Sequence, residues 1–118
     1  MGVTKDTFVK TVGASWSFFG AMFLLVPKVF WEMNFNSPAF TEATEFLARL
    51  LGVSISFISY MLWTGDADKL FVPTLVTLTA IAYFGPYTAE KKFDTTVMHK
   101  LPVVLMPALL LLGAAAYF

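Results

Sequence analysis

The sequence contains no cysteine and a single histidine among its 118 residues. Without thiols it forms no disulfide, and it offers neither a thiolate metal ligand nor a cysteine nucleophile. The one histidine, His99, excludes a metal site or a haem with two histidine ligands from one chain. The sequence also lacks a glycine-rich phosphate loop and paired carboxylates within its apolar runs, so no motif demands an enzyme and we expect none.

Charge is also scarce. Only 14% of the residues are charged, the formal net charge is zero and no basic segment occurs, which argues against a nucleic-acid partner. Hydrophobic residues make up 58% of the chain and the mean hydropathy is +0.72. A water-soluble domain of this size cannot bury so much apolar surface, so the composition predicts a membrane protein.

Four stretches contain no Asp, Glu, Lys or Arg, namely 11–27, 50–65, 70–89 and 101–118. With flanking residues, each approaches the roughly 20 residues with which a helix crosses a hydrocarbon core of about 30 Å. They predict transmembrane helices near 7–31, 42–64, 69–88 and 97–117. A β-barrel is excluded because its strands alternate apolar and polar residues.

The expected fold class is therefore all-α: an integral-membrane, up-down-up-down bundle of four transmembrane helices, forming one domain over residues 1–118. Lysines are nearly balanced between the two sides, so the orientation stays open. As a multi-pass membrane protein, the chain is equally compatible with the thylakoid, the mitochondrial inner membrane or the bacterial inner membrane.

Three charged residues, Glu42, Glu45 and Arg49, share one face at the start of the second predicted helix. In one interpretation they form a structural seam, in which Glu45 and Arg49 are an i, i+4 pair that pins the helix to its neighbours near the membrane surface. In the other, Arg49 is a counter-ion in a binding cavity for a quinone head, an anionic lipid or a carboxylate, since charge within a membrane is often functional.

Small residues spaced four apart predict where the helices touch, because they let backbones approach closely inside a membrane. Gly13, Ser17 and Ala21 form such a series in the first helix. Gly52 and Ser56 form one in the second helix, on the face that carries Arg49. We therefore expect the first two helices to pack through these five positions.

Aromatic residues make up 17% of the chain, including 13 Phe. Most fall at predicted helix ends, as interfacial aromatic belts do, or face lipid and other helices. No cofactor is required, although chlorophyll, carotenoid or lipid could lie between the Phe-rich faces. His99 is expected to be an interfacial histidine, with ligation of a chlorophyll magnesium or a haem iron as the alternative.

The segment from Gly20 to Pro27, the following PKVFWEMNF and the ARLLG at 48–52 together resemble the DoxX-like group of small four-helix membrane proteins. The resemblance covers the first half of the chain and implies a compact up-down bundle. Some members of that group are linked to thiol or quinone redox complexes as auxiliary subunits, but the absence of cysteine argues against thiol chemistry here. Arg49 and Gly52 are the matched positions.

These features favour a small integral-membrane accessory subunit at the edge of a larger membrane complex, for example a photosystem or a respiratory assembly. Its partners would be other integral-membrane subunits. The alternative is a stand-alone quinone- or lipid-binding protein, or a redox auxiliary, with Arg49 lining the pocket. A transporter is less favoured, because the four helices show no internal repeat.

Overall fold

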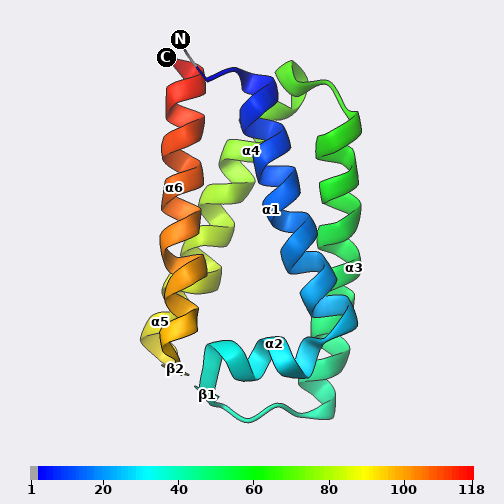
Figure 1. The fold of residues 1–118 in the computed structure, drawn as a ribbon, viewed down its shortest axis with the longest axis vertical. Helices are drawn as coiled ribbons and strands as arrows, with labels where there is room; N and C mark the ends of the chain where they lie inside the picture. Colours follow the sequence, from blue (N-terminus) through cyan, green and yellow to red (C-terminus); the bar gives the residue numbers. More distant parts are fainter. Residues whose placement is uncertain (1–2) are drawn as a thin grey trace.

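The first long helix ends earlier than the sequence predicts. In the computed structural model, which describes residues 3–118, α1 spans Lys5–Leu25 and a second helix, α2, spans Pro27–Asn34 (Figure 1). Between them Val26 leaves the helical conformation, with φ −135° and ψ 55°. Proline disfavours helical geometry in the residue before it and supplies no N–H to the preceding turn. The single helix expected over 7–31 is thus two helices.

Helix α2 lies across one end of the molecule, nearly perpendicular to the long helices (Figure 1). Its inner face buries Phe30 and Asn34, whereas Lys28 and Glu32 are exposed and lie 3.9 Å apart. This amphipathic pattern explains why a helix of eight residues is stable here: it closes one end of the bundle with its apolar side.

The second long helix, α3, spans Glu42–Thr64, and the sequence predicts 42–64. The Thr41 hydroxyl accepts a hydrogen bond from the Thr44 backbone N–H at 3.2 Å and caps the helix. Helix α4 spans Ala67–Ala82, and the Asp66 carboxylate caps it in the same way. Both caps satisfy N–H groups that no helical carbonyl can reach.

The helical path does not stop where the sequence predicts, at residue 88. After α4 it widens into a π-helical segment, Tyr83–Tyr87, and resumes as α5, Thr88–Lys92. Pro86 lies in the wider segment and cannot donate a backbone hydrogen bond, which accounts for the local change of helix type. The Thr88 hydroxyl donates to the carbonyl of Tyr83 at 2.5 Å and stabilises the widened turn.

Two short strands, which the sequence does not predict, join the loops at the end where α2 lies. Strand β1, Phe35–Ser37, pairs antiparallel with β2, Asp94–Thr95. A short 3-10 segment, Val97–His99, then leads into α6, Lys100–Tyr117, where the sequence predicts one helix over 97–117. The strands are too short to produce an alternating pattern.

Within residues 3–118, four helical segments are long and apolar enough to cross a membrane: Lys5–Leu25, Glu42–Thr64, Ala67–Lys92 and Val97–Tyr117. They alternate in direction, and the chain begins and ends at the same end of the molecule (Figure 1). Helix α1 is central, with α3 on one side and α4 and α6 on the other. Because α3 makes few or no contacts with α4 or α6, the arrangement is open along α3.

The main core lies between α1 and the helices around it. Its buried side chains are Phe8, Val9, Val12, Trp16, Phe19, Phe30, Leu62, Phe71, Leu78, Met106 and Leu109. Trp16, which the sequence places inside a helix, is 3% exposed and belongs to this core. Packing in the core is therefore the role that the structure supports for Trp16.

Helices α1 and α3 approach most closely at two glycines. A Cβ atom added to Gly52 would lie 2.7 Å from the backbone nitrogen of Leu24 and 2.9 Å from the carbonyl oxygen of Gly20. A Cβ on Gly20 would lie 2.6 Å from the hydroxyl oxygen of Ser56. Because backbone atoms surround Gly52, no side-chain rotation can make room for a methyl group there.

Replacing Gly52 with Ala is therefore expected to destabilise the protein by about 1–3 kcal/mol, the usual cost of forcing atoms into a packed interior. The matched control is Gly85→Ala, where the nearest atom to an added Cβ is the Ile81 Cγ2 at 4.0 Å. Reversible unfolding in mixed micelles measures both. Equal stability of the two variants would contradict the close contact at Gly52.

Candidate functional site

Arg49 links the start of α3 to the end of α1. Its Nη1 donates to the carbonyl oxygen of Leu24 at 2.6 Å. Its Nε and Nη2 donate to Oε1 of Glu45 at 3.3 and 3.1 Å. The guanidinium is thus held by a carbonyl from one helix and a carboxylate from the other, although the arginine side chain remains 48% exposed.

The position of Leu24 explains why an arginine is needed there. Leu24 belongs to the last turn of α1, where carbonyl groups have no partner within the helix. Arg49 satisfies one of them and places positive charge at the negative end of the α1 dipole. Glu42 and Glu45 lie in the first turn of α3, where the dipole favours acids. The two acids therefore suit the start of α3, and the arginine suits the end of α1 that it contacts.

The contact at Gly52 brings these groups together. Gly52 lies one helical turn after Arg49 and packs directly against the backbone of Leu24. A side chain at Gly52 would push the two helices apart and move the Leu24 carbonyl away from the guanidinium. Arg49 and Gly52, which stand three residues apart in ARLLG, thus contact the same residue of α1, Leu24. This shared contact favours the structural interpretation of Arg49 over the binding-cavity interpretation.

A second polar site lies at the same end of the molecule, around His99. The histidine is 3% exposed. Its Nδ1 lies 3.3 Å from Oδ1 of Asn34, and its Nε2 lies 3.2 Å from the carbonyl oxygen of Pro86. The ring also packs against Phe35, with 5.1 Å between the ring centroids. His99 therefore joins α2 and β1 to the π-helical segment.

Every polar partner of the His99 ring is an acceptor. The amide of Asn34 is oriented by its own donation from Nδ2 to the carbonyl of Phe30 at 2.8 Å, so its oxygen faces the imidazole. Nε2 faces the Pro86 carbonyl and lies 3.7 Å from Oε2 of Glu90. Neither nitrogen points into open space, so ligation of a magnesium or iron would require one of these contacts to break.

Glu90 extends this site toward the surface. It forms an ion pair with Lys100, and Thr95 donates to its Oε2 at 3.3 Å. The backbone N–H of Thr96 donates to the carbonyl of Asn34 at 2.9 Å. Asn34, Glu90, His99 and Lys100, here called the end cluster, therefore tie together three separate parts of the chain.

The sequence identifies His99 but not its partners in the end cluster. Asn34 lies 65 residues away along the chain and its spacing carries no periodic signal. The break before Pro27, where the sequence predicts one helix over 7–31, is the feature that brings Asn34 under the bundle. Within residues 3–118 no group of three His, Asp or Glu side chains is arranged to hold a metal ion.

The small residues predicted to pack lie where α1 meets α3, with one exception. The carbonyl of Gly13 accepts a hydrogen bond from the Ser59 hydroxyl at 2.6 Å, and Ser17 also bonds to Ser59. Gly52 and Ser56 lie against Gly20. Ala21, by contrast, is exposed, so the prediction for this position is wrong and Gly20 takes its place.

The reason is the register of the crossing. A step of four from Ser17 gives Ala21, whereas the face that meets α3 follows a step of three from Ser17 to Gly20. Steps of three and four are both compatible with one helix face, so spacing alone does not choose between them.

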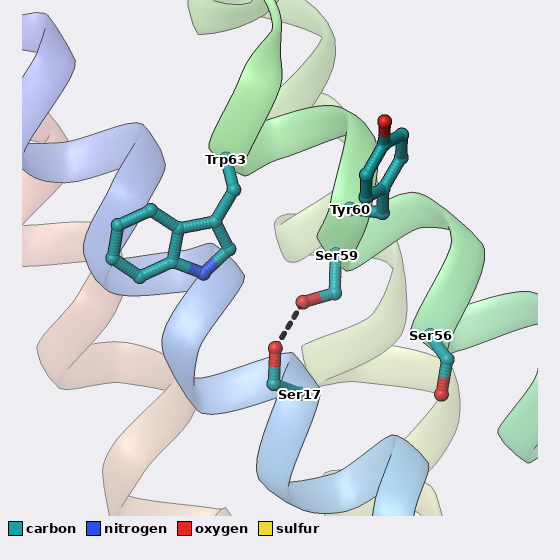
Figure 2. A pocket seen from close by; sticks show the side chains of 5 residues that line it. All are labelled: Ser17, Ser56, Ser59, Tyr60 and Trp63. Carbon is teal, nitrogen blue, oxygen red and sulfur yellow. Dashed lines mark hydrogen bonds between the residues drawn. The ribbon is translucent and has the colours of Figure 1, made fainter.

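A groove of about 330 Å³ opens between α1 and α3 on the outer surface, and five side chains line it (Figure 2): Ser17, Ser56, Ser59, Tyr60 and Trp63. A second hollow, of about 460 Å³, lies on α4 and extends into the π-helical segment; Leu75, Val76, Thr79, Ala80, Tyr83 and Phe84 line it. Arg49 and His99 line neither. The polar groove is a feature that sequence analysis interpreted only as helix packing.

Comparisons of the chain with protein-family models, with curated proteins and with solved structures found no match. The resemblance to the DoxX-like group therefore stays a prediction.

Replacing Arg49 with Ala is expected to lower stability by about 1–2 kcal/mol, because the Leu24 carbonyl loses a charged donor. Glu45→Gln is the control: it keeps that carbonyl contact and weakens only a half-exposed ion pair, with an expected cost of about 0.5 kcal/mol or less. Unfolding of both variants in mixed micelles provides the measurement. If Arg49→Ala is as stable as wild type, the guanidinium does not anchor α1.

Replacing His99 with Phe should cost about 1–3 kcal/mol, because the oxygen that accepts the ring N–H, that of Asn34 or that of Pro86 according to the tautomer, is left without a donor. Lys100→Gln alters only a solvent-exposed partner of Glu90 and should have a small effect. Thermal unfolding of the detergent-solubilised protein distinguishes the two. A stable His99→Phe variant would show that these hydrogen bonds are dispensable.

Proposed function

We propose that the protein is a multi-pass integral-membrane accessory subunit that packs against other membrane subunits and performs no reaction of its own. Support comes from the four helical segments with the length and hydropathy of membrane spans. The loops between them are short, so almost no mass would lie outside the bilayer. The role would be to shape or stabilise the edge of a larger assembly.

The open side of α3 is the observation that carries this proposal. Helix α3 packs along α1 and has little or no contact with α4 or α6, so most of its circumference is uncovered. Exposed apolar side chains follow one another along it at offsets of zero, four, seven and eleven: Phe46, Leu50, Val53 and Phe57. This spacing is the one by which a helix presents a continuous seam to a partner helix.

The polar residues in the protein suit an anchoring role. Arg49 and His99 are both engaged with backbone carbonyls of this chain, and each connects two helical segments. Three N–H groups of Arg49 donate to acceptors within this chain, which favours an anchoring role. The alternative of a quinone-binding protein centred on Arg49 therefore has less support than the accessory subunit.

An energy-transducing complex, such as a photosystem or a respiratory assembly, is the kind of partner we propose. These complexes contain many small apolar subunits at their edges. Chlorophyll or carotenoid bound between this subunit and its neighbours would be held by the apolar faces of α3 and α4, because both His99 nitrogens already have partners.

Gentle solubilisation of native membranes tests this proposal. We expect the 13.1 kDa chain to migrate with a particle many times its own mass, and the visible absorbance of that fraction to identify any chlorophyll or haem. Val53→Trp should reduce association by disrupting the α3 seam, whereas Val104→Trp, on the exposed face of α6, should not. Migration of the wild-type chain alone would contradict the proposal.

A further inference from the structure

We propose that α2 is an interfacial helix, which lies in the plane of the bilayer surface and inserts one apolar flank among the acyl chains of the surrounding phospholipids. This inference rests on the proposed placement in a membrane but not on a partner subunit. Helix α2 crosses one end of the bundle nearly at right angles to the long helices (Figure 1). In a bilayer that the long helices span, it therefore lies parallel to the membrane surface.

A contact at the start of α2 fixes its level along the bundle. Arg49 of α3 donates to the carbonyl oxygen of Leu24, which stands three residues before Pro27, the first residue of α2. Arg49 is also the last charged residue before the charge-free run 50–65. The start of α2 therefore lies at the level where α3 passes from charged to apolar residues, which is where headgroups give way to hydrocarbon.

Contacts at the end of α2 place it at the same kind of boundary. The carbonyl oxygen of Asn34 accepts from the backbone N–H of Thr96 at 2.9 Å. The Asn34 side chain contacts His99, which immediately precedes Lys100. Lys100 is in turn the last charged residue before the charge-free run 101–118. Both ends of α2 are thus held where apolar runs begin, so the whole helix lies at the membrane boundary.

The side chains of α2 are distributed around it as an interfacial helix requires. Phe30 is buried and packs against two phenylalanines of α1, so it points toward the interior of the bundle. At about 100° per residue, Lys28 and Glu32 both project about 160° from Phe30, away from the hydrocarbon. Val29 and Met33, here called the open flank, project on one side, about 100° and 60° from Phe30.

The two flanks of α2 differ in how the protein covers them. Trp31, on the flank opposite the open one, packs against Phe35 and donates from its indole N–H to the carbonyl oxygen of Pro38 at 2.8 Å. On the open flank, Val29 and Met33 are 56% and 37% exposed. Residues that follow α2 in the chain therefore cover the Trp31 flank, whereas the open flank is available to another apolar material.

Acyl chains are the occupant that this position favours. The open flank faces sideways in the plane of the membrane, at the level where hydrocarbon begins. It consists of two side chains one turn apart, which is much shorter than the seams by which membrane-spanning helices pair. Charged residues on the opposite side and an apolar face buried about 5–10 Å into the boundary of headgroups and acyl chains are typical of helices that lie on a bilayer.

The test uses nitroxide labels, because a chain without cysteine can be labelled at one introduced cysteine at a time. Lys28→Cys and Glu32→Cys label the charged side of α2, and Val29→Cys and Met33→Cys label the open flank. Val76→Cys is the matched control, since Val76 is 64% exposed and lies within the charge-free run 70–89. Each purified full-length variant is reconstituted in phosphatidylcholine vesicles. Power-saturation spectroscopy with oxygen, which enters hydrocarbon, and with nickel EDDA, which stays in water, gives the depth of each label.

We expect the two open-flank labels to lie about 5 Å deeper than the labels on the charged side, because an α-helix is about 10–12 Å in diameter. All four should lie shallower than the Val76→Cys label. Equal access of the nickel complex to all four would overturn the proposal. Protection of the open flank from both reagents would also overturn it, because protein rather than lipid would then cover that flank.

Two further readings separate this proposal from the ones on which it depends. Access of the nickel complex to the Val76→Cys label would overturn the placement in a membrane, and this proposal with it. Because the isolated chain is used, the depth of α2 does not depend on whether a partner complex exists. Thermal unfolding of each labelled variant checks that it folds.

Discussion

The close backbone contact where Gly52 of α3 meets Gly20 and Leu24 of α1 is the constraint on which the other features depend. It sets the distance between the two helices and therefore the reach of every side chain that bridges them. Arg49 reaches the Leu24 carbonyl one turn before the contact. Ser59 reaches the Gly13 carbonyl nearly two turns after it. The anchor and the groove are thus two consequences of one helix crossing.

Two polar side chains, Arg49 and His99, contact backbone carbonyls where the helical path is interrupted. Arg49 supplies the donor that the last turn of α1 lacks. His99 faces the carbonyl of Pro86 within a widened helical turn. In an apolar environment a carbonyl without a hydrogen-bond donor is costly. Where proline interrupts the backbone hydrogen bonds of a helix, a side chain from another element can supply the donor. Each of these two polar contacts therefore lies beside an interruption of the helical path.

Much of this organisation is legible in the sequence because it follows from simple rules. Charge-free runs locate the four long apolar segments, and Thr41 marks the start of α3. The spacing of Arg49 and Gly52 correctly identifies the face of α3 that meets α1. The break at Pro27 is not predicted: the sequence indicates one helix over 7–31, and the structure shows that the chain turns sideways into α2.

The remaining features depend on contacts between distant residues. The choice of Gly20 over Ala21 reflects the crossing register, which neither helix determines alone. The partnership of Asn34 with His99 requires α2 to lie beneath α6, and the pairing of β1 with β2 involves strands too short for any periodicity. The groove between α1 and α3 is recognised only when the two helices are placed side by side. Each residue that lines it is, by itself, typical of a membrane helix.

The early end of α1 also fixes the thickness of bilayer that the protein fits. With 21 residues, α1 is about 32 Å long, close to an average hydrocarbon core of about 30 Å, so it can stand nearly upright. The helical path Ala67–Lys92 has 26 residues and reaches about 39 Å. Its charged residues lie in its first and last turns, so the charge-free run 70–89, with 20 residues or about 30 Å, is the part that would lie in the hydrocarbon. Both paths would therefore fit the same bilayer, and the extra length of Ala67–Lys92 would carry its terminal charges beyond the hydrocarbon on both sides.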